Sequence, residues 1–333
     1  MRVRPCLGSF AAAALAVAMR AVAMLVVSTI AALPALAQSY PAQTVRLVVP
    51  FPAGSATDNI ARIIGNELQQ SLGQPFIVDN KPGAQGMLGA DVVAKSPADG
   101  YTILVAAVSF AATESMFKKR AFDTVGDFTP ISRVATTPLA LMVKSDFPAK
   151  TTKEFIDYVK ANPGKLSAGY GSSSSQVCIA QLESLAKLDV LEVPYKGIPL
   201  AVNDVLGGVL QFTFVDLGNA IAQARGGNLR AIAVTSEKRS SLVPDWPALA
   251  ETLPGFDIDA WIAVLGPKNL PREIAQKLHD ATVKALAKPD VLARLATMGF
   301  TPALLGPSEA GPFIKSEVAK WSKLVKQAGI VPE

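Results

Sequence analysis

The chain has 333 residues, of which 50% are hydrophobic and 18% are charged, and its formal net charge is +5. Residues 1–37 hold three arginines and no acidic residue, so without them Lys and Arg fall from 32 to 29 (32 minus these three) against 27 Asp and Glu. This near balance removes the main argument for a nucleic-acid partner. His279 is the only histidine and Cys178 the only cysteine after residue 37, which excludes a His/Cys zinc cluster and an intramolecular disulfide from that part.

The first 37 residues have the pattern of a secretory signal peptide. Arg2, Arg4 and Arg20 precede or interrupt an alanine-rich segment, residues 21–33 are uncharged and mostly apolar, and residues 35–37 give an A-x-A cleavage site. Arg20 leaves the apolar run shorter than the roughly 20 residues that a membrane anchor needs. We therefore expect cleavage after residue 37 and export of the mature chain.

The mature chain opens with a strand, a turn and a helix. The β-branched run Val45–Val49 predicts the strand, and Ile60, Ile63, Ile64 and Leu68 recur on one face of the helix. Ser55, followed three residues later by an aspartate, has the form of a capping box. The amides of such a first turn carry about half a positive charge and suit a carboxylate or phosphate. An ordinary strand-to-helix connection would have the same pattern.

Two similar series of short strands and amphipathic helices follow, which predicts an open α/β sheet in two lobes. The extended runs Ala140–Val143 and Ala231–Thr235 bracket the second series and are the expected crossings, with hinges near Val143 and Thr235. The predicted lobes are residues 38–142 with 236–333, and residues 143–235. The expected elements are 45–49, 60–72, 76–78, 88–94, 101–106, then 152–161, 166–169, 176–186, 190–194, 201–206, 212–215, 229–234, and finally 271–286 and 308–327.

Ligands of open α/β sheets bind outside the carboxyl ends of the strands, so the loops there are candidate binding segments. Several of these loops are rich in Gly, Ser, Pro and Asn, namely "NKPGAQG", "AAVSFAA", "YGSSSSQ", "PYKG" and "VDLGN". Gly171 and the serines that follow it stand before an amphipathic helix and repeat the arrangement of Gly54 and Ser55. Two such helix starts, one from each lobe, could face each other across a cleft. Simple helix capping, worth about 1 kcal/mol, is the alternative explanation.

Five stretches resemble the periplasmic solute-binding proteins of the tripartite tricarboxylate transporters, the TctC-like family or Bug receptors. They are "YPAQTVRLVVPFPAGSATDNIAR", "LGQPFIVDNKPGAQGMLGADVVAKSPADGYT", "VPYKG", "LRAIAVTSEKRSSLVPDWPALAE" and "AKWSKLVKQAGI". They occur in family order and span the mature chain. The resemblance implies an α/β fold of the type II periplasmic-binding-protein class, a Venus flytrap with two α/β lobes joined by two crossing strands. It also implies a receptor that delivers its ligand to membrane transporter subunits.

In this family the turn after the first strand presents backbone amides to a ligand carboxylate, often through ordered waters. Many neutral hydrogen bonds can hold an anion and still release it. The resemblance implies an organic, amino or aromatic acid as ligand, a monomeric receptor, and no metal or cofactor. The ligand-binding residues that it implies are Phe51, Ala53, Gly54, Ser55, Asp58, Ala84, Gln85, Ser109, Ser172, Ser173, Ser174, Ser175, Gln176, Tyr195, Lys196 and Asp216.

Two positions depart from the family pattern. Ser55 stands where relatives usually have a second glycine, and Val177 stands where they often have histidine. A ligand smaller or less charged than citrate is therefore expected. Asp58 either caps its own helix, which we favour, or meets a ligand ammonium or hydroxyl group. Lys196 is either a ligand contact or a solvated loop charge.

Two other functions remain open from the sequence. A periplasmic hydrolase could use a serine of the 172–175 run as its nucleophile, but a serine needs an activating base. The only histidine, His279, falls in an amphipathic helix and is expected on a surface far from the cleft, so we predict a binder and not an enzyme. A ligand-sensing receptor that docks on a membrane sensor kinase would use the same fold.

Overall fold

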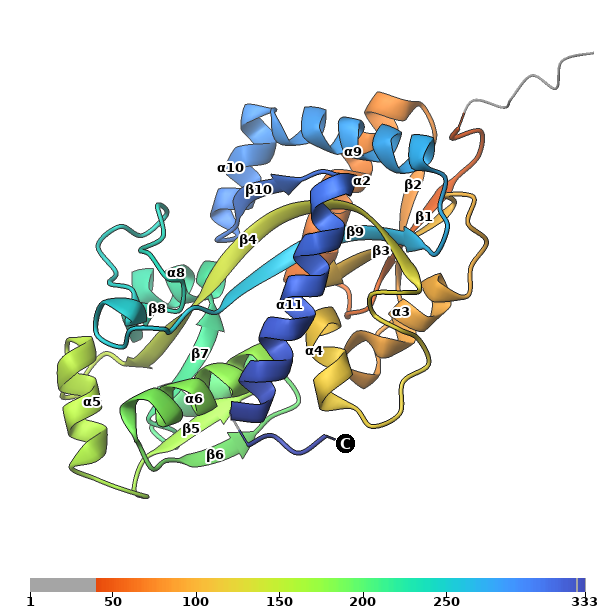
Figure 1. The fold of residues 1–333 in the computed structure, drawn as a ribbon. Coiled ribbons are helices and arrows are strands. Elements are labelled where there is room, and N and C mark those ends of the chain that lie inside the picture. Colours follow the sequence, from red (N-terminus) through yellow and green to blue (C-terminus); the bar gives the residue numbers. More distant parts are fainter. Residues whose placement is uncertain (1–39, 328, 333) are drawn as a thin grey trace, which may run out of the picture. The chain divides into compact units, whose positions relative to one another are not determined.

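The structure is a computed structural model that describes residues 40–327 and 329–332 (Figure 1). The predicted signal peptide, residues 1–37, lies outside the described residues. Gln43–Glu333 form a unit separate from the residues before them. None of the helices in the described residues has the length and apolar character that a membrane crossing requires.

Ten strands form one curled sheet with the order β2-β1-β3-β9-β4-β7-β5-β6. The two remaining strands, β10 and β8, both pair with β4. The strands are β1 Val45–Val49, β2 Phe76–Asn80, β3 Thr102–Ala107, β4 Phe128–Lys144, β5 Ser167–Tyr170, β6 Leu191–Pro194, β7 Phe212–Asp216, β8 Leu229–Val234, β9 Asp259–Pro267 and β10 Thr301–Leu305.

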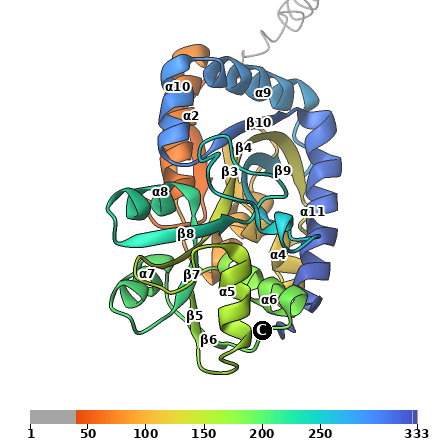
Figure 2. The same ribbon diagram turned by 90° about the vertical axis from the view of Figure 1, so that its left-hand side faces the viewer.

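Helices follow most strands and cover both faces of the sheet (Figures 1 and 2). The α-helices are α2 Ala56–Leu72, α3 Met87–Ala94, α4 Ser109–Met116, α5 Thr152–Lys160, α6 Ser173–Ala186, α7 Ile198–Leu206, α8 Leu217–Arg225, α9 Arg272–Leu286, α10 Pro289–Thr297 and α11 Pro307–Gln327. Two short 3-10 helices are η1 Ala84–Gly86 and η2 Leu249–Glu251.

The long strand β4 connects the two lobes (Figure 1). Its first part, from Phe128 to Pro138, pairs with β9, and its last part, from Leu139 to Val143, pairs with β7. We call the lobe of β1, β2, β3, β9 and β10 the first lobe, and the lobe of β5 to β8 the second lobe. The chain thus has the two-lobe periplasmic-binding-protein fold. The lobe boundaries at residues 142/143 and 235/236 stay a prediction.

The opening strand and helix form where the sequence predicts them. β1 is almost completely buried, as expected for a strand with neighbours on both sides, since it pairs in parallel with β2 and β3. Ile60, Ile64 and Leu68 of α2 are all buried against the sheet. Ser55 is the N-cap, and Gly73 ends the helix with a φ of 76°, the left-handed conformation that glycine favours.

Several elements of the fold were not predicted from the sequence. Only residues 140–143 of β4 were expected as a strand; the unpredicted part contains Pro130 and Pro138, a residue type that central strands disfavour. In the structure, irregular register between β4 and β9 accommodates Pro130. The "AAVSFAA" and "VDLGN" segments were read as loops, but α4 and α8 begin within them. Both helices are short, and α4 is buried on several sides, so α4 has no clear polar face to reveal it.

The last helix, α11, contacts α4 and β4 of the first lobe and α6 of the second (Figure 2). Its Glu317 carboxylate accepts hydrogen bonds from two buried indoles, at 2.8 Å from Trp261 and 3.3 Å from Trp321. Trp261 belongs to β9, so this carboxylate fixes α11 to the strand beside the cleft.

Candidate functional site

A cavity of about 220 Å³ lies where β4 and β9 pass between the lobes. We call it the helix-end cavity, because residues at the N-terminal ends of five helices line it. These helices are α2 and α4 of the first lobe and α6, α7 and α8 of the second. The rest of its wall is mainly apolar and includes Phe51, Leu139, Trp261, Ile262 and Phe300.

The first-lobe end of the cavity is formed by α2. Its first two residues, Ala56 and Thr57, line the cavity. Amides in a first helical turn have no acceptor within the helix. The next amide, of Asp58, donates to the Ser55 hydroxyl at 3.2 Å, whereas those of Ala56 and Thr57 have no acceptor in the described part of the chain. These two amides are therefore available to an anion.

The turn before α2 is placed differently from the prediction. Phe51 lines the helix-end cavity, but Ala53, Gly54 and Ser55 do not. The Gly54 amide donates instead to Asp58 Oδ2 at 2.8 Å, and Gly54 has a φ of 82° with open space around it. A ligand contact for these three residues stays a prediction.

The second-lobe end is formed by α6. Ser172, Ser173 and Ser174 line the cavity. Ser172 is the N-cap and accepts from the Ser175 amide at 3.2 Å, while the buried Ser175 hydroxyl accepts from the Ser172 amide at 3.1 Å. The first turn of α6 contains no acidic residue. No carboxylate of its own first turn therefore opposes the partial positive charge of this helix end.

Three further helices begin at the same cavity. Ser109 is the first residue of α4, Ile198 is the first residue of α7, and Asp216 is the N-cap of α8. The Asp216 carboxylate accepts from the Asn219 amide at 3.2 Å and from the Asn219 side chain at 2.8 Å. Among the described lining residues it is the only formally charged side chain.

Three other predicted residues, Gln85, Gln176 and Tyr195, lie together at a separate cavity of about 520 Å³. Glu192 and the C-terminal residues 329–331 also line it. Burial, followed by the hydrogen bond and the negative charge of Glu183, raises the pKa of Glu192 to about 7. The predicted ligand residues that line a cavity are thus divided between two cavities, and the five helix ends meet at the smaller one.

Besides Ala53, Gly54 and Ser55, four further predicted residues line neither of these cavities. Ser175 is fully buried in the cap of α6, whereas Ala84 and Lys196 are exposed. Asp58 is buried and bonds to Gly54, to Arg62 at 3.0 Å and to Asn80 at 2.9 Å. Burial alone would raise the pKa of Asp58, but these three hydrogen bonds outweigh it and hold the pKa below its ordinary value.

We expect Asp58→Ala to lower thermal stability at pH 7 and leave carboxylate affinity nearly unchanged, because Asp58 holds the turn and not the cavity wall. A lowered carboxyl pKa stabilises the fold above the pKa of the unfolded chain, near 3.8, and this contribution is lost as pH falls below it. The melting-temperature difference from the parent should therefore shrink at low pH. Intact stability with lost binding would instead make Asp58 a ligand contact.

The sequence matches a family model described as the tripartite tricarboxylate transporter family receptor, TctC, over residues 60–330. The chain belongs to this family. The resemblance seen in the sequence is therefore confirmed, and the family is one of periplasmic solute-binding receptors and not of enzymes.

Individual relatives agree with the TctC assignment. The chain is 35% identical to Protein BugT of Bordetella pertussis over 305 residues, which cover 90% of this chain and 93% of BugT. Among solved structures, the periplasmic binding protein BugD is 32% identical with a TM-score of 0.78, covering 88% of this chain and all of BugD. An R. palustris protein solved with adipate is 30% identical with a TM-score of 0.81, over 88% of this chain and all of that protein.

Several residues that line this TctC-family cavity were not predicted from the sequence. Thr57, Thr137, Trp261 and Phe300 line it, yet the last two follow β1 by more than two hundred positions. No local pattern indicates that they meet Phe51. Val177, the second departure from the family pattern, is fully buried in the hydrophobic core and lines neither cavity.

The hydrolase alternative gains no support from the geometry. His279 Nδ1 lies 3.1 Å from the Ser132 hydroxyl, and neither residue lines the helix-end cavity. The serines of α6 bond to one another and to backbone groups of their own turn. In residues 40–327 and 329–332, no group of three or more His, Cys, Asp or Glu side chains is placed to hold a metal ion.

Proposed function

We propose that this TctC-family receptor captures a small carboxylate in the helix-end cavity and delivers it to a tripartite membrane transporter. The observation that carries the proposal is the meeting of five helix N-termini at a cavity whose described lining contains no Lys or Arg. A helix N-terminus carries amides without an intrahelical acceptor and a partial positive charge, which at α8 the Asp216 carboxylate opposes. Anions are the ligands for which this arrangement is suited.

The apolar wall determines what kind of body the carboxylate ligand can have. Phe51, Trp261 and Phe300 can pack against a hydrocarbon or aromatic body, while the amides of Ala56, Thr57 and Ser173 hold its carboxylate oxygens. The cavity has room for about seven water molecules at roughly 30 Å³ each. That size suits a small organic, amino or aromatic acid. The adipate bound by the R. palustris relative supports the carboxylate class.

The receptor is proposed to work in the periplasm as a monomer, released from its signal peptide after residue 37. A ligand that contacts α2 and α6 touches both lobes, so its binding favours the closed arrangement of the lobes. Neutral hydrogen-bond donors hold the anion without a lysine or arginine partner, so release to the transporter does not require a buried ion pair to separate.

Isothermal titration of residues 38–333 with adipate, other mono-, di- and tricarboxylates, amino acids and aromatic acids tests the proposal. We expect one-to-one binding with a Kd between micromolar and nanomolar, about −8 to −12 kcal/mol. Ala260→Phe should fill the cavity and abolish this binding, whereas Ala287→Phe, at an exposed helix end, should not. Failure of every acid, or full binding by Ala260→Phe, would refute the proposal.

A further inference from the structure

The two strands that pass between the lobes have a cavity on each face. Successive side chains of a strand point to opposite faces. Accordingly Thr137 and Leu139 of β4 line the helix-end cavity, while Thr136 and Pro138 line a second cavity of about 430 Å³. We call this second one the back cavity. It also includes Ser236, Asp259 and Thr301.

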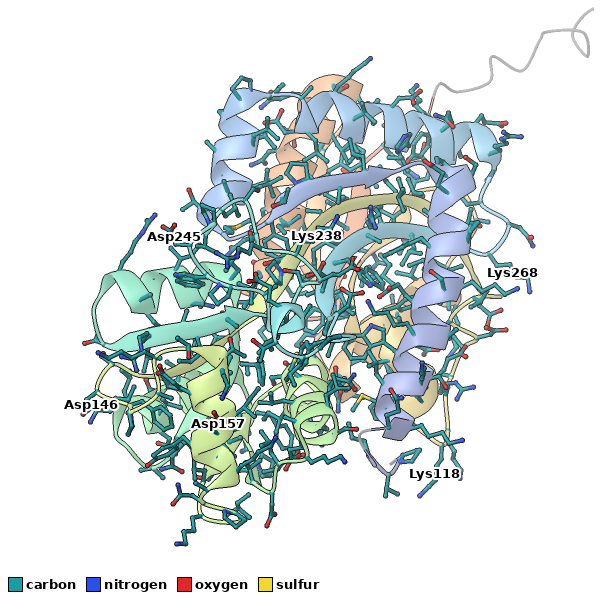
Figure 3. The ribbon with its side chains drawn as sticks, turned by 60° about the vertical axis from the view of Figure 1, so that its left-hand side comes forward. Lys118, Asp146, Asp157, Lys238, Asp245 and Lys268 are labelled. Carbon is teal, nitrogen blue, oxygen red and sulfur yellow. The ribbon has the colours of Figure 1, made fainter. Side chains whose placement is uncertain are left out.

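The back cavity lies between segments anchored in different lobes. Thr301 is the first residue of β10 and pairs with Thr136 in the first lobe. Ser236 begins a loop that continues to Trp246, which packs against the cluster containing Ala140 of the second lobe. Lys238 of this loop lies near the level at which the two halves of the molecule meet in Figure 3.

Thr235 is hydrogen-bonded to both segments that pass between the lobes, to Leu139 in β4 and to Ile258 just before β9. Its buried hydroxyl accepts from the Leu139 amide at 2.8 Å and lies 2.6 Å from the Ile258 carbonyl. Its backbone amide donates to the Leu139 carbonyl at 2.9 Å, and its carbonyl accepts from the Ile258 amide at 2.9 Å. Because Thr235 is bonded to both segments that pass between the lobes, it is suited to act as the pivot of a lobe rotation.

The lobes also touch through two glycines whose near neighbours Asp216 and Phe300 line the helix-end cavity, so we assign this contact to the cleft side of the pivot. Gly218 lies in the first turn of α8, two residues after Asp216, and Gly299 immediately precedes Phe300. A Cβ placed on Gly218 would lie 2.3 Å from the Met298 carbonyl oxygen, and one on Gly299 would lie 2.3 Å from the Gly218 nitrogen. Two backbones can approach this closely only where no side chain intervenes.

We propose that these two regions set the closure equilibrium of the receptor, and thereby its affinity, without touching the ligand. Rotation about the Thr235 pivot that brings the cleft sides together must move the back sides apart. Bulk at the Gly218 contact therefore opposes closure, while bulk in the back cavity opposes opening. Because the ligand favours the closed form, the first change weakens binding and the second strengthens it. This inference rests on the proposed binding function.

The test compares Gly218→Ala with Thr301→Trp. Gly218 is helical, and alanine is normally the better helix residue, so harm from Gly218→Ala would come from the contact. Gly311→Ala is the matched control, since Gly311 lies within α11 and has nothing within 4 Å of its added Cβ. Lys165→Trp, at an exposed loop residue, controls for the tryptophan.

Two readouts are measured on each folded variant. Spin labels are attached to Lys118→Cys in the first lobe and Asp157→Cys in the second, at exposed positions labelled in Figure 3. Cys178 is buried and should not be labelled. The distance between the two labels, measured without ligand, reports the separation of the lobes. Titration with adipate reports affinity. We expect Gly218→Ala to lengthen the label distance and raise the Kd about tenfold, about 1.4 kcal/mol. Thr301→Trp should shorten the distance and lower the Kd severalfold, with both controls unchanged.

Label distances that stay at the parent value in both variants, or move in the same direction, would overturn the proposal. If Gly218→Ala has the same label distance and Kd as Gly311→Ala, the proposed role of the glycine contact is wrong. If adipate does not bind the parent protein, the label distances still decide the closure question. Failure of the carboxylate proposal is thus distinguished from failure of this one.

Discussion

Ala56→Pro is expected to raise the Kd for a bound carboxylate by about 10- to 150-fold while the protein keeps its fold. Proline removes the Ala56 amide, one of the two at the α2 end of the cavity that have no acceptor in the described residues. A hydrogen bond to a charged group contributes about 1.5–3 kcal/mol, which gives this range. The substitution suits the backbone, since proline is favoured at the first helical position and Ser55 before it has a ψ of 160°.

The matched control is Arg272→Pro, because Arg272 is the exposed first residue of α9 and lines neither cavity. Both variants should melt close to the parent temperature. Calorimetric titration should then separate them, with binding weakened only in Ala56→Pro. Equal affinity of Ala56→Pro and parent protein would show that the α2 amides do not hold the ligand, and would leave the α6 end as the anion site.

Glu317→Leu is expected to lower the free energy of unfolding by about 3 kcal/mol. The carboxylate accepts hydrogen bonds from Trp261 and Trp321, and both indoles are only 1% exposed. Leucine would leave two buried N–H groups without an acceptor, at about 1–3 kcal/mol each. Removing a buried charge offsets part of this cost. Urea unfolding followed by circular dichroism measures the change.

Two further variants test whether the indole hydrogen bonds are the source of this loss of stability. Glu317→Gln retains an acceptor for the indoles and should lose clearly less stability than Glu317→Leu. Glu273→Leu, at an exposed position in the first turn of α9, should change stability by well under 1 kcal/mol. If leucine and glutamine at position 317 behave alike, the indole hydrogen bonds are not the source of the effect.

The elements that the sequence predicted well are those with strong local signals. The β-branched run Val45–Val49, the apolar stripe of α2 and the Ser55 cap all depend on residues within a few positions of one another. The serine cap of α6 is equally local, since Ser172 and Ser175 bond only within their own turn. Short-range hydrogen bonding and periodicity are enough to fix such features.

The site itself was predicted only in part, because neighbouring residues of one turn can face different surroundings. Phe51 faces the helix-end cavity, but the Gly54 amide three positions on bonds to Asp58. Likewise Ser174 lines that cavity, while Gln176, two positions later, lines the larger one. The direction in which each group points depends on the packing of the whole helix.

The sequence alone therefore determined the family, the alternation of strands and helices, and the capped starts of α2 and α6. Only the tertiary structure decided that five helix ends meet at one cavity, and that Trp261 and Phe300 complete its wall. It also decided that Gly218 and Gly299 touch beside the pivot. The physical reason is the distance along the chain between the residues that interact. A cap or an apolar stripe is set by residues a few positions apart. These contacts join residues far apart in the sequence, and they form because β4 pairs with β9 in the first lobe and with β7 in the second.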